Sequence, residues 1–278
     1  MGWFKRGWAL TRTSWNVLMT DKELLVYTAL SALCTLVAAA ALLLPGALIY
    51  TSGAGGNEAV ALAMLFLFYL VMSFIALYFN TALTGAVLVR LRGGDPTVQT
   101  GFKVARGHLG AIAGYAAISA TVGVLLYLLE TKFELICRLA SALLGGAWSV
   151  VTFLVVPVLV AEDCSPFEAI KRSTGLLKRT WGEQVSGGLS ISGIMFLFAL
   201  PALLVGALLV FTGTTAGLIA AVVFGGIYLG GLFLIGSALS QILRAAVYVY
   251  AQTGEVPNQF DGWMLRDAFK TKGRAAAA

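Results

Sequence analysis

The chain has 278 residues, of which 59% are hydrophobic and 12% are charged, whereas soluble domains carry about 25% charged residues. A soluble fold of this length could not bury so much apolar surface, so the composition excludes an ordinary soluble protein and predicts a membrane protein. The net charge of +6 does not indicate nucleic-acid binding, because the basic residues flank apolar segments. With three cysteines in no paired spacing and one histidine, neither a disulfide framework nor a metal or cofactor site is expected.

The first segment, residues 3–19, is predicted to be an amphipathic helix that lies in the membrane surface. Its apolar stripe advances in steps of three or four residues, while Lys5 and Arg12 fall on or beside the opposite face. This stripe consists of Phe4, Trp8, Thr11, Trp15 and Leu18. Two charge-free segments follow, at 24–57 and 59–89, and each exceeds the ~20 residues that cross the hydrocarbon.

The same order of segments then returns. Residues 95–109 form a second amphipathic stretch, for which Asp95, followed by Pro96, is predicted to be the N-cap. Its apolar stripe consists of Val98, Phe102, Ala105 and Leu109, and its cations include Lys103 and Arg106. Two further spans are predicted, at 107–129 and 139–161.

A third amphipathic stretch covers residues 165–181. Ser165, Pro166 and Glu168 fit a capping box at its start. The apolar stripe consists of Phe167, Ile170, Thr174, Leu177 and Trp181, and the basic residues are Lys171, Arg172, Lys178 and Arg179. No charged residue lies between Glu183 and Arg244, and a turn at 212–215 divides this run into two spans. Pro45, Pro157 and Pro201 lie in predicted spans, which they should kink or end early.

These segments predict an all-α, polytopic transmembrane bundle with six spans, built from three repeats of one surface helix followed by two spans. Only Lys132 and Arg138 of the 19 Lys and Arg residues fall on one side, which leaves 17 on the side of both termini. The positive-inside rule therefore places both termini and the surface helices in the cytoplasm, with the protein in the cytoplasmic membrane. Residues 1–258 are expected to form one membrane domain and 259–278 a cytoplasmic tail, of which the last six are expected to be non-native.

One stretch resembles a known group of proteins. The matching residues are Pro157, Glu162, Ser165, Pro166, Ala169, Ser173, Leu177 and Trp181. In these positions the chain is similar to a family of uncharacterised prokaryotic six-span proteins, and through them to the membrane domain fused to some glycerophosphodiester phosphodiesterases. The resemblance implies a fold and no established activity. The phosphodiesterase's catalytic domain has no counterpart here, so its chemistry is not implied.

Polar residues near the cytoplasmic boundary form one candidate site. They are Asn80, Glu162, Asp163, Gln241 and Arg244. Polar groups within spans are costly and often functional, so we expect a vestibule in which Arg244 meets Glu162 or Asp163 and Asn80 bonds to Gln241. The alternative is that these side chains snorkel or make ordinary hydrogen bonds between helices.

Two further groups of residues are candidates for contacts with lipid or with other copies of the chain. The expected membrane-surface residues, for anionic headgroups, are Trp3, Trp8, Trp15, Lys103, Arg106, Lys171, Arg172, Lys178 and Trp181. Alternatively, the basic helices only connect spans and pack on the ends of the bundle. Gly226 and Gly230 form a small-residue motif that suits helix packing within the chain or a homo-oligomer.

The leading functional hypothesis is a homo-oligomeric channel or transporter for ions or small solutes. Its support is the repeated architecture, the glycine-rich sixth span and the polar cluster, although no span carries polar residues along its whole length. The alternative is a non-transporting scaffold that binds anionic lipid or envelope partners through its basic helices. An enzyme is not expected, because the chain carries none of the common catalytic motifs and only one histidine.

Overall fold

The computed structural model describes residues 3–51, 58–132, 135–180, 184–257 and 259–260, and every regular element in these ranges is an α-helix. In chain order the helices are α1 (Trp3–Thr20), α2 (Leu24–Thr51), α3 (Glu58–Leu91), α4 (Val98–Gly107), α5 (Leu109–Lys132), α6 (Leu135–Val151), α7 (Val155–Glu162), α8 (Pro166–Thr180), α9 (Gln184–Phe211) and α10 (Thr215–Thr253). Within the described residues, six segments are long and apolar enough to cross a membrane, and α6 and α7 together supply the fourth. The prediction of an all-α bundle with six spans is confirmed.

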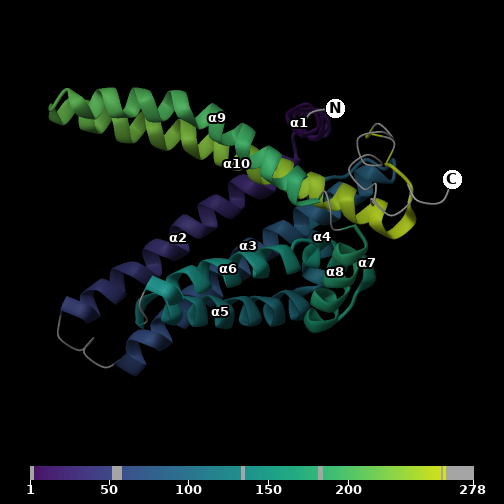
Figure 1. Cartoon of the computed structure of the whole chain (residues 1–278), viewed down its shortest axis with the longest axis horizontal. Helices are drawn as coiled ribbons and strands as arrows, with labels where there is room; N and C mark the ends of the chain where they lie inside the picture. The colour runs from purple at the N-terminus through teal and green to yellow at the C-terminus, as the bar shows by residue number, and fades with distance from the viewer. Residues whose placement is uncertain (1–2, 52–57, 133–134, 181–183, 258, 261–278) are drawn as a thin grey trace.

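The short helices gather at one end of the molecule. Figure 1 shows α1, α4, α7 and α8 near the end of α10, while the long helices extend away from them. The α9–α10 hairpin diverges from α2, α3, α5 and α6 (Figure 1). Most of the buried core also lies toward this end, in residues such as Leu83, Val87, Leu159, Leu239 and Ile242. The side of the membrane that this end faces remains a prediction.

The order of helices follows the predicted repeat. One amphipathic helix precedes two spans in the groups α1–α3, α4–α7 and α8–α10. In α4, Ala105 is buried, Phe102 packs against the core, and Lys103 and Arg106 are exposed, as the amphipathic pattern predicts. The helix is capped by Thr97, whose side chain accepts from the Thr100 backbone N–H. The expected N-cap, Asp95, instead pairs with Arg90.

Helix α1 keeps two of its tryptophans outside its contact with the bundle. Leu10, Ser14, Val17 and Leu18 are its buried residues toward the bundle, together with the hydroxyl-bearing Thr11 and Thr13, whereas the side chains of Trp8 and Trp15 are exposed. The reason is that α1 packs against α9 and α10 on one side only. The two tryptophans border this contact, where they are available to lipid.

Helix α8 is anchored by small residues. Ala169 and Ser173 are fully buried and Leu177 is nearly so, and these positions lie four residues apart on one face. Phe167, two positions before Ala169, therefore falls on the opposite side and is exposed. The predicted cap is confirmed, because Ser165 Oγ accepts from the Glu168 backbone N–H at 3.4 Å.

The fourth span is interrupted at 152–154, between α6 and α7. Ser173 of α8 stabilises the interruption, because its hydroxyl donates to the Val151 carbonyl at 2.6 Å and accepts from the Leu154 N–H at 3.2 Å. Pro157 follows shortly after, in the first turn of α7, where its missing N–H costs little. Pro45 and Pro201, in contrast, lie inside helices that continue past them.

A charged network joins the α1–α2 turn to the end of α3. Asp21 accepts two hydrogen bonds from the Arg90 guanidinium, which also contacts Asp95 at 3.0 Å. Glu23 accepts from the Val98 backbone N–H at the start of α4. The first and second repeats are therefore joined by polar contacts at the end where the short helices lie.

Candidate functional site

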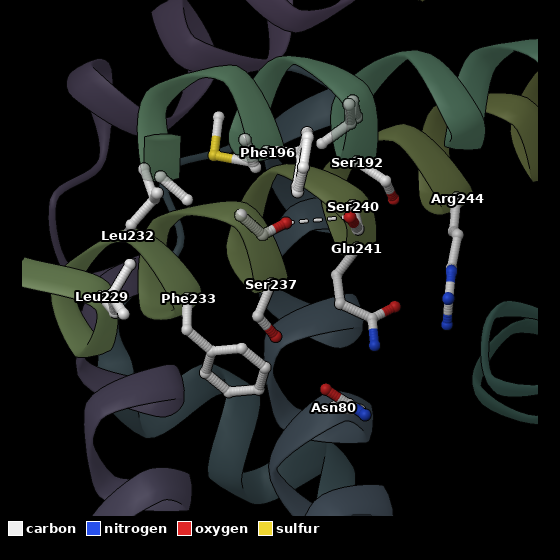
Figure 2. Close-up of a pocket in the computed structure, with 14 residues that line it drawn as sticks. Asn80, Ser192, Phe196, Leu229, Leu232, Phe233, Ser237, Ser240, Gln241 and Arg244 are labelled. Atoms are coloured by element: carbon white, nitrogen blue, oxygen red, sulfur yellow. Dashed lines mark hydrogen bonds between the residues drawn. The ribbon is translucent and has the colours of Figure 1, made fainter. Parts of the chain in front are cut away.

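A cavity of about 540 Å³ lies where the α9–α10 hairpin leaves the rest of the bundle. Its walls come from α3, α9 and α10 (Figure 2). The polar residues that line it are Asn80, Ser192, Ser237, Ser240, Gln241 and Arg244. Apolar residues, among them Phe196, Leu229 and Phe233, complete its walls.

One face of α10 supplies a large part of the cavity wall. Phe233, Ser237, Gln241 and Arg244 follow one another at intervals of four, four and three residues, which places them on one side of the helix. Figure 2 shows these side chains pointing to the same side, toward the helix that carries Asn80. Along this face the chemistry changes from aromatic to hydroxyl, amide and finally guanidinium.

Two polar atoms in this wall are buried without a hydrogen-bond partner. Gln241 is 4% exposed and its Oε1 accepts no hydrogen bond, and Nε of Arg244 is likewise buried and unbonded. Ser240, by comparison, is satisfied, because its hydroxyl donates to the Gly236 carbonyl at 2.8 Å. Native structures rarely leave buried polar atoms unpaired, so the donor and the acceptor have capacity for a ligand.

The guanidinium of Arg244 is held against an aromatic ring. Its Cζ lies 5.0 Å from the centroid of Phe153, within the range of a cation–π contact. Phe153 belongs to the interruption between α6 and α7. The broken fourth span therefore contributes directly to the surroundings of this cation.

The predicted ion pair between Arg244 and Glu162 or Asp163 is wrong. Glu162 accepts from the Tyr248 hydroxyl at 3.2 Å and pairs with Arg172 at 3.0 Å. Because Tyr248 follows Arg244 by one helical turn, Glu162 reaches α10 one turn too far along to meet the guanidinium. Asp163 ends α7 with a left-handed backbone (φ 44°) and faces His108 at 3.4 Å.

Asn80 and Gln241 do share the cavity, as expected. Their side chains point toward one another in Figure 2, but Gln241 Oε1 receives no hydrogen bond. Of the five predicted vestibule residues, the structure thus brings together Asn80, Gln241 and Arg244. It places the two carboxylates elsewhere.

A protein-family model matches residues 59–258, which is more than half of the chain. The chain belongs to DUF6159, a family of unknown function. This family membership agrees with the resemblance to an uncharacterised family, whereas the likeness to the membrane domain of phosphodiesterase fusions stays a prediction. No curated protein and no solved structure matches the chain.

The predicted surface residues are mostly exposed in this DUF6159 protein. Trp8, Trp15, Lys103, Arg106, Lys171 and Arg172 all reach the surface. Arg172 also pairs with Glu162, so it stabilises the bundle whether or not it meets lipid. Trp181, and the side chains of Trp3 and Lys178, lie outside the described residues.

Gly226 and Gly230 are exposed on α10, and a Cβ at either position would have no described atom within 4 Å, apart from chain neighbours and the backbone of α10 itself. They therefore do not mediate close packing with another described helix. A contact with a second copy of the chain stays a prediction.

The residues that the sequence analysis missed are Ser192, Phe233, Ser237 and Ser240. The spacing of Phe233 and Ser237 from the predicted residues Gln241 and Arg244, on one helix face, was a usable signal for these two positions. Ser192 gave no such signal, because its place depends on how α9 packs against α10.

Proposed function

We propose that the protein is a membrane transport protein that binds an anionic solute in the cavity lined by Asn80, Gln241 and Arg244. The observation that carries this proposal is Arg244 itself. It lies in a candidate span, lines a cavity, and has no Asp or Glu within salt-bridge distance among the described residues.

An unpaired guanidinium in such a place is costly. Ionisable residues within spans normally pair with one another or line a pathway for substrates or ions, and a buried charge without a partner destabilises a fold by several kcal/mol. The Phe153 ring compensates only part of this cost. An anion bound beside Arg244 would supply the missing charge, and the Asn80 and Gln241 amides could donate to its oxygens.

The interrupted fourth span supports a carrier rather than a permanently open pore. Discontinuous helices commonly form the binding sites of secondary transporters, in which repeats move against one another around the site. Here the interruption places Phe153 beside Arg244. The charged and amide groups are confined to one end of the cavity, which suits a binding site better than a continuous aqueous path.

The test uses purified protein in liposomes loaded with radiolabelled inorganic phosphate, sulfate or dodecyl phosphate. We expect protein-dependent release of at least one of these anions. Arg244→Gln should abolish the release, whereas Lys171→Gln, at an exposed residue of α8, should retain it. The proposal is wrong if liposomes with correctly inserted protein release none of the three anions faster than equally loaded liposomes without protein. It is also wrong if Arg244→Gln does not change the release.

One observation favours a second candidate, a scaffold that binds anionic lipid through its surface helices. Trp8 and Trp15 are exposed on the same helix as Arg12, an arrangement typical of interfacial helices. In this case the protein should bind vesicles rich in anionic lipid through α1 without moving any of the three anions. Both proposals place the short helices on the cytoplasmic side of the cytoplasmic membrane.

A further inference from the structure

We infer that the anion bound at Arg244 is the head of an amphiphile, whose hydrocarbon chain lies in a second cavity that adjoins the first. This inference rests on the proposed function and specifies the class of its substrate. Its head would be a phosphate or carboxylate, and the chain would enter sideways from the bilayer.

The first observation is the second cavity. It measures about 530 Å³ and lies between α2, α3 and α10. It shares Asn80, Phe233 and Ser237 with the cavity at Arg244, so the two spaces meet at these residues. A molecule longer than a simple inorganic anion could occupy both.

The second observation is the chemistry of the walls. Beyond the shared residues, the second cavity is lined by apolar side chains, including Leu36, Met72 and Phe79, and by four residues with hydroxyls. Of these four, Tyr27 and Thr28 already donate to backbone carbonyls, and the other two are Ser31 and Thr35. Within the described part of the chain, no charged residue lines it. Such a wall suits a hydrocarbon chain and offers nothing to balance a second charge.

The third observation is where the space opens. Phe233 is 72% exposed and Leu36 69% exposed, and both lie within candidate spans. Side chains exposed at this depth face hydrocarbon, so the opening leads into the bilayer. The site is therefore reached from the lipid, the phase in which amphiphiles are concentrated.

The dimensions agree with a head and a chain. Arg244 and Phe233 are eleven residues apart on α10, which corresponds to about 16 Å along the helix. Among the described residues that line the two cavities, Arg244 is the one cation, and it lies at one end, beside Phe153 of the interruption between α6 and α7. This arrangement orients an amphiphile with its head toward the short helices and its chain toward the bilayer centre.

The experiment measures ligand-induced shifts in the unfolding temperature of the detergent-purified protein. The probes are inorganic phosphate and the alkyl phosphates with four, eight and twelve carbons. We expect the apparent affinity to rise at least tenfold from the shortest to the longest chain. Arg244→Gln should lower the apparent affinity for every probe at least tenfold, while Arg244→Lys should retain partial binding.

Variants of α2 separate the chain from the head. Ala32→Trp places a large side chain in the second cavity. It should abolish the dependence of the affinity on alkyl-chain length without lowering the affinity for inorganic phosphate. The matched control is Ala29→Trp, at an exposed residue of the same helix that does not line the cavity, and it should behave as the native protein does. Monodispersity by gel filtration establishes that each variant is folded.

The outcomes distinguish the two proposals. If inorganic phosphate binds as tightly as dodecyl phosphate and both require Arg244, the amphiphile inference is wrong and the anion site stands. If the affinity rises with chain length but Ala32→Trp does not alter it, the chain lies elsewhere and this inference is also overturned. If Arg244→Gln changes no binding, both proposals fail.

Discussion

At the scale of single residues, the contact between Asp21 and Arg90 offers a direct test of what holds the α1–α2 turn against the end of α3. Asp21 is 7% exposed, whereas Asp95, which contacts the same guanidinium, is 91% exposed. Removing one partner of a buried pair costs up to about 3–5 kcal/mol when the other charge is left without a partner, while an exposed pair contributes about 0–1 kcal/mol. Without Asp21, Arg90, which is 20% exposed, would keep only the exposed Asp95. Asp21→Asn should therefore lower the unfolding temperature in detergent far more than Asp95→Asn does. Equal effects of the two substitutions would show that Asp21 is not a buried anchor.

Cys164 provides a second prediction, which concerns pH. Burial of its thiol and, secondarily, the negative charges of Glu162 and Glu168 raise the pKa of this cysteine. A raised pKa leaves less thiolate at a given pH, so alkylation should be slow at neutral pH and should accelerate only in more alkaline solution. The measurement is the rate of N-ethylmaleimide modification against pH, with Cys34 and Cys137 replaced by Ser.

The matched control for Cys164 is a single cysteine at the exposed position Gln99, in a background without the native three. It should reach half of its maximal rate at a lower pH than Cys164 does. Glu168→Gln removes one of the charges and should shift the Cys164 profile toward lower pH. Identical profiles for Cys164 and the Gln99 position would contradict the raised pKa.

At the same scale, the sequence located Arg244 as a functional candidate but gave it the wrong partners. Its place in a run without other charges was visible, as was its spacing from Gln241. What could not be seen was a difference of one helical turn, which brings Glu162 to Tyr248 instead. From the sequence, the depth of a residue in its span is estimated from the positions of the charged residues that flank the span. That estimate is too coarse to distinguish positions one helical turn apart.

At the scale of elements, the contact between α4 and its neighbours depends on a glycine. A Cβ on Gly101 would lie 2.5 Å from the Ala82 carbonyl oxygen of α3 and would also overlap the Tyr27 hydroxyl of α2. Tyr27 itself donates to the Val98 carbonyl at 2.9 Å. Gly101→Ala should therefore separate these helices and lower the unfolding temperature, despite the better helix propensity of alanine.

Gly107 in the same helix is the control, because a Cβ there would meet no described atom within 4 Å beyond its chain neighbours and its own helix backbone. Gly107→Ala should be neutral, or stabilising by up to ~1 kcal/mol. The check is thermal unfolding of both variants in one detergent. A Gly101→Ala protein as stable as the Gly107→Ala protein would refute the close contact.

Elements whose cause is local were predictable from sequence. The three amphipathic helices and the long apolar spans follow from periodicity and charge, and Ser165 caps α8 as its neighbours in sequence suggest. The interruption at 152–154 was not predictable, because Ser173 of another helix satisfies the freed backbone groups. The side of α1 that is covered, with Leu10, Ser14 and Val17, was not predictable for the same reason, since its packing against α9 and α10 decides which face is covered.

At the scale of the whole molecule, orientation can be tested by labelling. Single cysteines at Ala216, near the tip of the α9–α10 hairpin, and at Gln99, in α4, lie at opposite ends of the bundle. The positive-inside rule predicts that intact cells label Ala216→Cys with a membrane-impermeant thiol reagent, and that Gln99→Cys reacts only after permeabilisation. The reverse pattern would invert the orientation assigned from the basic residues.

The number of spans follows from where charged residues and turns divide the apolar sequence. The divergence of the α9–α10 hairpin, which creates the cavities, does not. It depends on which helices pack together near the short helices and which remain apart, and the apolar residues exposed along the far part of α9 and α10 carry no signal for that choice. The site could therefore be assembled only in part from the sequence, through the residues of a single face of α10.

The length of α10 has a consequence for how the protein responds to its host membrane. Its 39 residues extend over about 58 Å, nearly twice the ~30 Å of hydrocarbon. A helix so much longer than the bilayer is thick must tilt or protrude, and the balance between the two shifts with lipid composition. Because Arg244 belongs to this helix, thicker bilayers should draw it deeper and thinner ones release it toward water. The acyl-chain length of the surrounding lipid would then change the affinity of the site for its anion without any change in the residues that line it.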